Sequence, residues 1–139
     1  KTFEITFPKD WGFDDKTDLV FFYPVSSNKQ IAFSVVKRHK LSPSNLAEWE
    51  AETKSVFVAE SEKLGYRFSE FQEISVANHA ALRANFQREK DGVAEKGVVI
   101  RVFTPLTDFE LNYSVPPDRF DEFLPTFEQF VQSFRVLQK

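Results

Sequence analysis

The chain has 139 residues, with 18 Lys or Arg against 21 Asp or Glu, for a formal net charge of −3. This length suits a single domain over residues 1–139, and the acidic balance argues against a nucleic-acid partner. Cysteine is absent, which excludes disulfide scaffolds, thiolate metal sites and thiol nucleophiles, whereas phenylalanine occurs 17 times and methionine not at all.

The N-terminal part of the chain predicts three strands. Apolar and polar residues alternate over 3–7, the period of a strand with one buried face. Residues 19–23 and 31–36 are almost continuously apolar, which is typical of strands that are covered on both faces of a sheet. The intervening residues 9–18 predict a loop, with Trp11 and Phe13 turned inward.

A helix is predicted over residues 43–64. Ser42 suits the N-cap, Pro43 the first helical position, and Gly65 the left-handed C-cap. Apolar residues at helical spacing are expected to form its buried stripe: Leu46, Trp49, Val56, Phe57 and Leu64. The opposite face is rich in glutamate and is expected to be solvated.

Period-two patterning returns after this helix and predicts an antiparallel meander. Its strands are expected over 71–76, 80–88, 98–104 and 109–115. Asn78-His79 is expected to form the first tight turn because Asn tolerates a positive φ. A longer polar hairpin loop that ends at Gly97 is expected to follow the second strand.

The C-terminal segment predicts a second helix. Because proline inside a helix is costly, Pro125 indicates a short turn over 118–123 and a main helix over 125–134. A short extended segment is expected over 135–137. Together the elements predict an α+β fold with an antiparallel sheet of about six to seven strands and with layers on both of its faces.

One segment has a metal-binding interpretation. Four aspartates stand close together in the predicted loop: Asp10, Asp14, Asp15 and Asp18. Carboxylate oxygens suit a hard cation such as Ca²⁺, but their spacing lacks the alternation of a calcium-binding loop. Solvated loop acids are the favoured interpretation, and no metal site is predicted.

Motifs for catalysis or cofactor binding are scarce. His39 and His79 lack the local spacing of metal ligands. No serine stands in a nucleophile elbow, and the four glycines form no phosphate-binding loop. The sequence therefore predicts neither an enzyme nor a cofactor. No apolar run approaches the ~20 residues of a membrane-spanning helix.

Short motifs along the chain resemble the PsbP-like and DcrB-like domains. In chain order they are Phe3-x-Ile5-x-Phe7-Pro8-x-x-Trp11, Gly65 followed by Ile74-x-Val76-x-Asn78-His79-x-Ala81, Val99-Ile100-x-Val102-Phe103, Leu111-x-Tyr113-x-Val115-Pro116, and Phe127-x-x-Phe130-Val131-x-Ser133-Phe134-x-Val136. Asn78 departs from the pattern, because these families more often have glycine there. The resemblance covers essentially the whole chain in element order.

The resemblance implies an α/β/α sandwich and a mostly non-enzymatic family. Its members include lumenal photosystem accessory proteins, periplasmic lipoproteins, cytosolic chaperones of type VI secretion effectors and a small Ran-binding nuclear import factor. The matching positions are core and turn positions, so no functional residue is carried over. Because the chain has no cysteine, a lipid attachment site either would lie upstream of it or has been lost.

The leading hypothesis is a non-catalytic accessory protein that binds another protein outside the cytoplasm, in the periplasm or thylakoid lumen, as a monomer or weak dimer. A cleaved leader would explain a chain that starts at Lys1, and so would a truncated end. The alternative is a cytoplasmic adaptor or chaperone for a type VI secretion effector, with an apolar groove on its sheet. A metal-dependent protein that uses the Asp10–Asp18 loop is a third hypothesis.

The phenylalanines narrow the search for a partner surface. Most of them fall on predicted core positions, where they are expected to supply the volume that methionine would otherwise fill. Four have no assured buried face: Phe13, Phe22, Phe103 and Phe120. Any of these four that is exposed is predicted to mark the surface that binds the partner.

Overall fold

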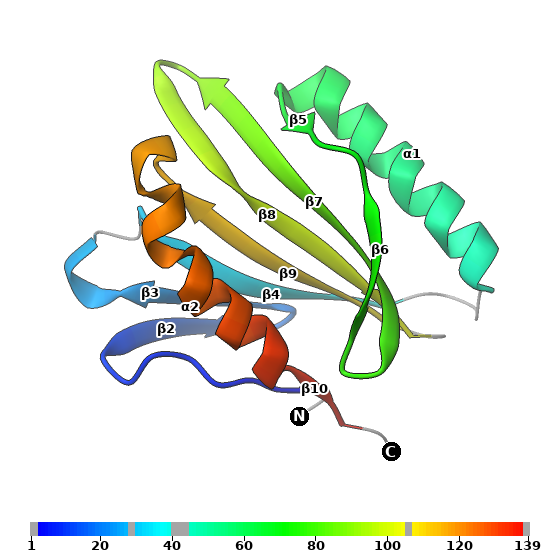
Figure 1. Ribbon diagram of the computed structural model, residues 1–139, viewed down its shortest axis with the longest axis horizontal. Helices are drawn as coiled ribbons and strands as arrows, with labels where there is room; N and C mark the ends of the chain where they lie inside the picture. Colours follow the sequence, from blue (N-terminus) through cyan, green and yellow to red (C-terminus); the bar gives the residue numbers. More distant parts are fainter. Residues whose placement is uncertain (1–2, 28–29, 40–44, 105–106, 138–139) are drawn as a thin grey trace.

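The structure, a computed structural model, describes residues 3–27, 30–39, 45–104 and 107–137. The strands are β1 (Phe3–Glu4), β2 (Trp11–Lys16), β3 (Leu19–Pro24), β4 (Ala32–His39), β5 (Arg67–Phe68), β6 (Gln72–Val76), β7 (His79–Lys90), β8 (Val93–Phe103), β9 (Thr107–Val115) and β10 (Arg135–Val136). Among these described residues, eight strands form one antiparallel sheet in the order β2-β3-β4-β9-β8-β7-β5, and β6 also pairs with β7 (Figure 1). The remaining two, β1 and β10, pair with each other.

The two helices lie on opposite faces of this sheet. The helix α2 (Phe120–Ser133) covers the face that carries Phe33, whose ring lies 5.3 Å from the ring of Phe127. The helix α1 (Leu46–Leu64) packs over β7 and β8 on the other face, where Phe57 contacts Val99. Two short 3-10 helices complete the chain, η1 (Val25–Ser27) and η2 (Pro117–Arg119). The predicted α/β/α sandwich is confirmed.

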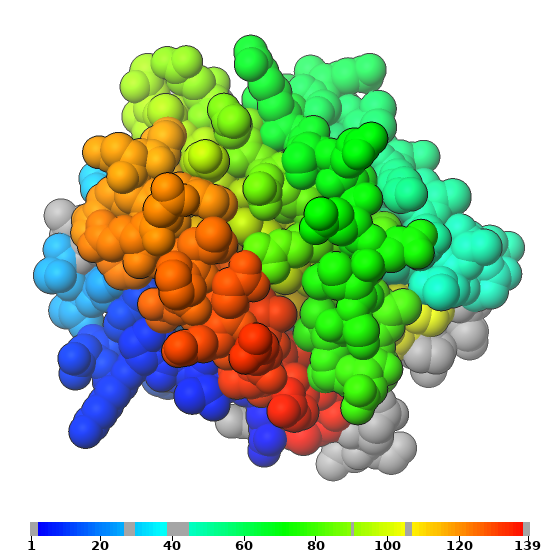
Figure 2. Space-filling view, in the orientation of Figure 1, coloured from blue at the N-terminus to red at the C-terminus, as the bar shows by residue number. Residues whose placement is uncertain are grey.

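The core beneath α2 is built from aromatic rings. Phe33 is fully buried, and its ring centroid lies 4.6 Å from that of Trp11, 4.8 Å from Phe130 and 5.6 Å from Tyr113. Each fully buried phenylalanine contributes about 1.5–3 kcal/mol. In Figure 2, which views the molecule from this side, α2 lies over the sheet and the blue N-terminal residues gather beside α2.

The start of α1 differs from the sequence prediction, and its end agrees with it. Asn45 is the N-cap, and its Oδ1 accepts a hydrogen bond of 2.8 Å from the Glu48 backbone N–H. The predicted cap Ser42-Pro43 lies outside the described residues. Gly65 ends the helix with φ of +79°, the left-handed value that the sequence predicts.

The predicted buried stripe of α1 is only partly correct. Trp49 and Phe57 are buried, together with Thr53, which the hydrophobic pattern does not select. The other three predicted positions are exposed: Leu46, Val56 and Leu64. Only a narrow side of α1 contacts the sheet, so the pattern overestimates the width of its buried face.

The prediction that Pro125 separates a turn from the main helix is wrong. The helix α2 runs continuously from Phe120, with Pro125 inside it. Proline removes one backbone N–H, which leaves the carbonyl of Asp121 without a helical donor. Asp121 is on the exposed side, where water can hydrate that carbonyl. The start of the helix is held by Tyr113, whose buried hydroxyl donates to the Phe120 carbonyl at 2.5 Å, and burial raises the pKa of this tyrosine to about 12.

The predicted loop over 9–18 is also wrong, because most of it forms the edge strand β2. Conversely, the strand predicted over 3–7 is limited to β1, although Ile5 and Phe7 still pack against the core. The short strand β5 was not predicted, and the 135–137 segment forms β10 as expected.

Both predicted hairpin turns are displaced. The first has its positive φ values at Ala77 and Asn78, at +52° and +67°, one residue earlier than expected. The second is the tight turn Asp91-Gly92, at +54° and +78°, so the expected long loop is instead strand. Gly97 therefore lies inside β8 and not at a loop end.

Gly97 is required by close packing in the sheet. A Cβ atom at this position would lie 1.7 Å from the Tyr113 carbonyl oxygen and 2.7 Å from the Phe86 ring. No side chain fits there without displacing main chain.

We predict that Gly97→Ala lowers the free energy of unfolding by about 3 kcal/mol, because the added methyl group overpacks the sheet. Gly92→Ala is the matched control. Its Cβ meets nothing within 4 Å, so only the cost of a positive φ remains, about 1 kcal/mol. Urea unfolding of both variants measures the difference, and equal losses would contradict this explanation.

Candidate functional site

The four phenylalanines predicted as partner-surface candidates lie in different environments. Phe22 and Phe120 are buried, with 4% and 7% of their surface exposed. Phe103 is half-buried, and its ring lies 5.3 Å from that of Trp49. Phe13 is 55% exposed. The structure therefore removes Phe22 and Phe120 from the candidate surface, and Phe13 is the strongest candidate that remains.

Phe22 and Phe120 are buried because segments from elsewhere in the chain cover them. The ring of Phe22 contacts Phe7 at 4.6 Å and Phe130 at 5.3 Å. The ring of Phe120 lies 5.4 Å from that of Tyr113. The alternating pattern of one strand does not indicate such tertiary contacts.

Phe13 borders a hollow of about 430 Å³ on the α2 side of β2 and β3, called here the β2 hollow. Its apolar lining is Phe3, Ile5, Phe7, Phe13, Leu19, Val20, Phe22 and Val35. The rings of Phe7 and Phe13 meet edge to face, with centroids 5.8 Å apart. The volume is in the range of small ligand sites, and five polar or charged residues complete the lining: Asp15, Lys16, Thr17, Asp18 and Lys37.

Charged groups border the β2 hollow without forming a metal site. Asp15, Lys16 and Asp18 are exposed there, and Lys37 Nζ lies 3.9 Å from Asp18 Oδ1. Successive residues of a strand point to opposite faces, so Asp14 is directed away from Asp15, and its Oδ1 accepts a 3.1 Å hydrogen bond from the Tyr23 hydroxyl. Among the described residues, no group of three or more metal-ligating side chains is placed to hold an ion.

The α1 side of β2, β3 and β4 forms a second candidate surface, called here the open face. It consists of the half-buried residues Phe21, Tyr23, Ala32 and Val36. A hollow of about 290 Å³ lies on it, lined by Asp14, Lys16, Phe21, Tyr23 and Ala32. The ring contacts of α1 are with Phe68, Phe71 and Phe103, on or next to β5, β6 and β8, and not with this part of the sheet.

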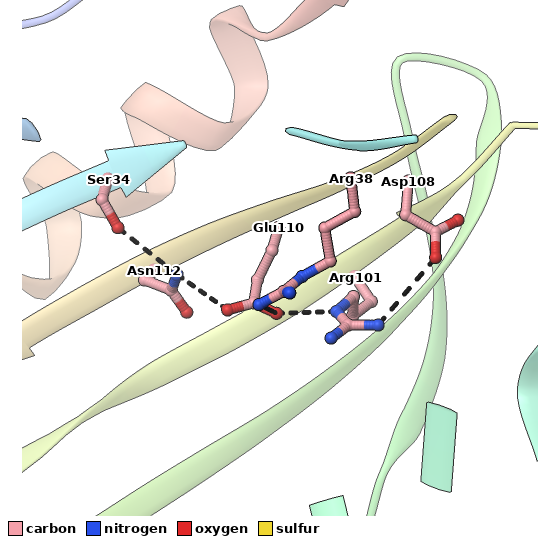
Figure 3. A network of polar contacts seen from close by, with 6 residues as sticks. All are labelled: Ser34, Arg38, Arg101, Asp108, Glu110 and Asn112. Carbon is pink, nitrogen blue, oxygen red and sulfur yellow. Dashed lines mark hydrogen bonds and ion pairs between the residues drawn. The ribbon is translucent and has the colours of Figure 1, made fainter. Parts of the chain in front are cut away.

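A polar network lies on the strands β4, β8 and β9 (Figure 3). The buried Arg101 places its Nε 2.6 Å from Glu110 Oε1 and its Nη1 3.9 Å from Asp108 Oδ2. Asn112 continues the network, because its Nδ2 donates to Glu110 at 3.0 Å and to Ser34 at 3.3 Å. Sequence reasoning missed this network, although a single arginine inside the apolar run of residues 98–104 was a signal for it.

The network connects the sheet with α1. The Arg101 guanidinium lies over the ring of Phe57, 5.3 Å from its centroid. Glu60, also on α1, has its pKa raised by burial and by the charge of Glu110, while Arg101 and Arg38 act in the opposite direction. With Arg101 and Asp108 buried, the arrangement is suited to fixing α1 on the sheet and not to admitting a substrate.

We predict that Glu60→Gln raises the free energy of unfolding at pH 7. The raised pKa means that ionisation of Glu60 costs more in the folded than in the unfolded state, so the penalty is present above the folded pKa. It disappears as the pH falls below the unfolded pKa, about 4.3. Urea unfolding at pH 7 and near pH 4 tests this, with the exposed Glu52→Gln as control. If the difference in unfolding free energy between Glu60→Gln and the wild type is the same at both pH values, this explanation is contradicted.

Comparison with known proteins bears on the fold. No protein-family model and no curated protein matches the chain. Among solved structures, it resembles PsbP (CyanoP) from Synechocystis sp. PCC 6803, with a TM-score of 0.73 and 14% identity over 98% of this chain and 87% of that one. It also resembles LpqN of Mycobacterium tuberculosis, described as involved in cell envelope biogenesis, with a TM-score of 0.66 and 12% identity over 98% and 83% of the two chains.

A third similar structure, from Bacteroides thetaiotaomicron VPI-5482, has a TM-score of 0.69 and 11% identity. The match covers 99% of this chain but only 46% of that one, so this chain spans about half of its length. Among the described residues, neither helix has the length and apolar character needed to cross a membrane. Identities this low are evidence of fold alone, and on that evidence the chain has the PsbP-like fold that its sequence motifs predict.

Proposed function

We propose that this protein is a non-catalytic accessory protein that binds another protein at the corner formed by Phe13 and the β2 hollow. The observation that carries the proposal is the 55% exposure of Phe13 at the border of the β2 hollow, where eight apolar side chains gather. Water solvates such a surface poorly, and contiguous exposed apolar surface on a folded domain marks interaction sites. Aromatic side chains beside a pocket are typical of the residues that dominate protein interfaces.

The shared fold supports an accessory role and an extracytoplasmic location, in the periplasm or thylakoid lumen. LpqN is described as involved in cell envelope biogenesis, and PsbP gives its name to the domain family that the sequence resembles. That family includes lumenal and periplasmic proteins. Fold alone does not determine function, so the partner must be identified by experiment.

The open face favours a second candidate, a cytoplasmic chaperone for apolar helices of a type VI secretion effector. Phe21, Tyr23 and Val36 are only half-buried there, and the described residues place no helix over them. A partner helix lying across this face would cover these side chains in the helix-in-groove mode. This candidate uses the opposite side of the sheet from Phe13, so the two are separable by substitution.

We predict that Phe13→Asp abolishes capture of the partner from cells that produce the protein, because a charge replaces the exposed aromatic contact. Val93→Asp is the matched control, since Val93 is 68% exposed but lies at the start of β8, away from the β2 hollow. Val93→Asp should unfold within about 0.5 kcal/mol of the wild type, and Phe13→Asp, which loses its ring contact with Phe7, should lose about 1 kcal/mol and stay folded. The measurement is affinity capture with quantitative mass spectrometry.

Each result of this capture experiment is decisive. A partner that is lost with Phe13→Asp and retained with Val93→Asp supports the proposal. A partner retained with Phe13→Asp but lost with Phe21→Ser, on the open face, would favour the chaperone candidate instead. Retention with all three variants would indicate that the binding surface lies elsewhere.

A further inference from the structure

We propose that the Asp91-Gly92 turn between β7 and β8 is a site of spontaneous covalent modification, at which Asp91 is converted to isoaspartate in the folded protein. The inference goes beyond the proposed function and does not depend on Phe13. Three features of the turn carry it: the exposure of its two residues, the space around Gly92, and the position of the turn outside the hydrogen-bond ladder.

The reaction is an attack on the Asp91 side chain by the amide that follows it. The Gly92 nitrogen forms a bond to Asp91 Cγ, and the amide proton leaves with the carboxyl hydroxyl as water, which closes a five-membered succinimide ring. Water then opens the ring at one of its two carbonyls. One opening restores aspartate, and the other leaves the peptide bond on the side-chain carbon as isoaspartate. One water leaves and one enters, so no other reactant is required.

The first two features are exposure and space. Both turn residues are exposed, and the Asp-Gly dipeptide occurs once in the chain. Glycine hinders the attack least, because it has no side chain beside the attacking nitrogen. A Cβ atom at Gly92 would meet nothing within 4 Å in the part of the chain that the structure describes, so the folded protein leaves the reacting groups open to water. Every other aspartate precedes a residue with a side chain.

The third feature is the main chain of the turn. The last pair of the β7–β8 ladder is Lys90 with Val93, so the amides of the two turn residues lie outside the ladder. Their φ values of +54° and +78° are those of a type I′ turn. A left-handed φ is unfavourable for a residue other than glycine, so departure of Asp91 from it is weakly opposed. Exposed turns of this kind open locally at little free-energy cost.

The modification changes the main chain and not the charge. Isoaspartate lengthens the backbone by one carbon atom and keeps one carboxylate. A two-residue type I′ turn does not accommodate another backbone atom, so the ladder pair nearest the turn, Lys90 with Val93, is expected to separate. In the sheet order, β9, β4 and β3 lie between this hairpin and β2, so the corner at Phe13 is expected to keep its structure.

The experiment is incubation of the folded protein at neutral pH in water labelled with heavy oxygen, followed by peptide mapping by mass spectrometry. Each succinimide cycle places one labelled oxygen in the peptide that contains Asp91, and a protein-isoaspartate methyltransferase counts the isoaspartate formed. We expect labelling at Asp91 to be at least about tenfold faster than at the exposed Asp118. It should also be within about tenfold of the rate in the urea-unfolded chain, because the folded turn opens easily.

Gly92→Ala is the matched variant. It keeps Asp91 and places one methyl group beside the attacking nitrogen, which should slow labelling at Asp91 by about tenfold or more while labelling at Asp118 stays the same. Three results would overturn the proposal. They are labelling at Asp91 no faster than at Asp118, labelling in the folded protein about a hundredfold or more slower than in the unfolded chain, and equal labelling of Asp91 in the wild type and Gly92→Ala.

Discussion

The packing of α2 against the sheet through Phe33 is the interaction on which the rest of the structure depends. Rings from three different elements meet this one side chain: Trp11 of β2, Tyr113 of β9, and Phe127 and Phe130 of α2. These contacts connect the edge of the sheet with its centre and with the C-terminal helix. The edge strand is therefore held by buried aromatic surface as well as by hydrogen bonds to β3.

The two faces of the sheet are stabilised by different kinds of interaction. Beneath α2 the contacts are apolar, whereas between α1 and the sheet a buried arginine and two carboxylates accompany a smaller aromatic cluster. A buried ion pair adds little net stability compared with apolar packing, but it tolerates few alternative geometries. We interpret the network around Arg101 as the constraint that fixes α1 over β7 and β8, which leaves the open face on β2, β3 and β4.

Sequence patterns predicted the layers of the fold because the hydrophobic period of an element and the residues that end it are local properties. Gly65 ends a helix since only glycine adopts its φ without strain, and the alternation over 109–115 marks a strand with one buried face. The predictions were wrong where tertiary contacts determine the local structure. Aspartates in residues 9–18 indicated a loop, but hydrogen bonds to β3 make this segment a strand. Pro125 is tolerated in a helix because buried phenylalanines hold both of its ends.

The candidate site was predictable only as a short set of residues. The sequence identified four phenylalanines whose burial it does not determine. In the structure, contacts with Phe7 and Phe130 bury Phe22, whereas Phe13 is exposed. No local pattern contains that information, since Phe7 and Phe130 come from opposite ends of the chain. The same holds for the network around Arg101, whose partners lie on β4 and β9.

The pairing of β1 with β10 has a consequence for folding. Phe3 pairs with Val136, and the backbone N–H of Thr6 donates to Ser133 Oγ at 2.8 Å, so β1 is completed by residues that are synthesised much later. Closing so long a loop is entropically costly, whereas the β7–β8–β9 meander needs only local contacts. On the ribosome, the N-terminal phenylalanines therefore emerge long before α2 can cover them. The nascent chain exposes an aromatic segment that is buried in the folded protein. Protection from aggregation is therefore more important during synthesis than the surface of the folded protein suggests.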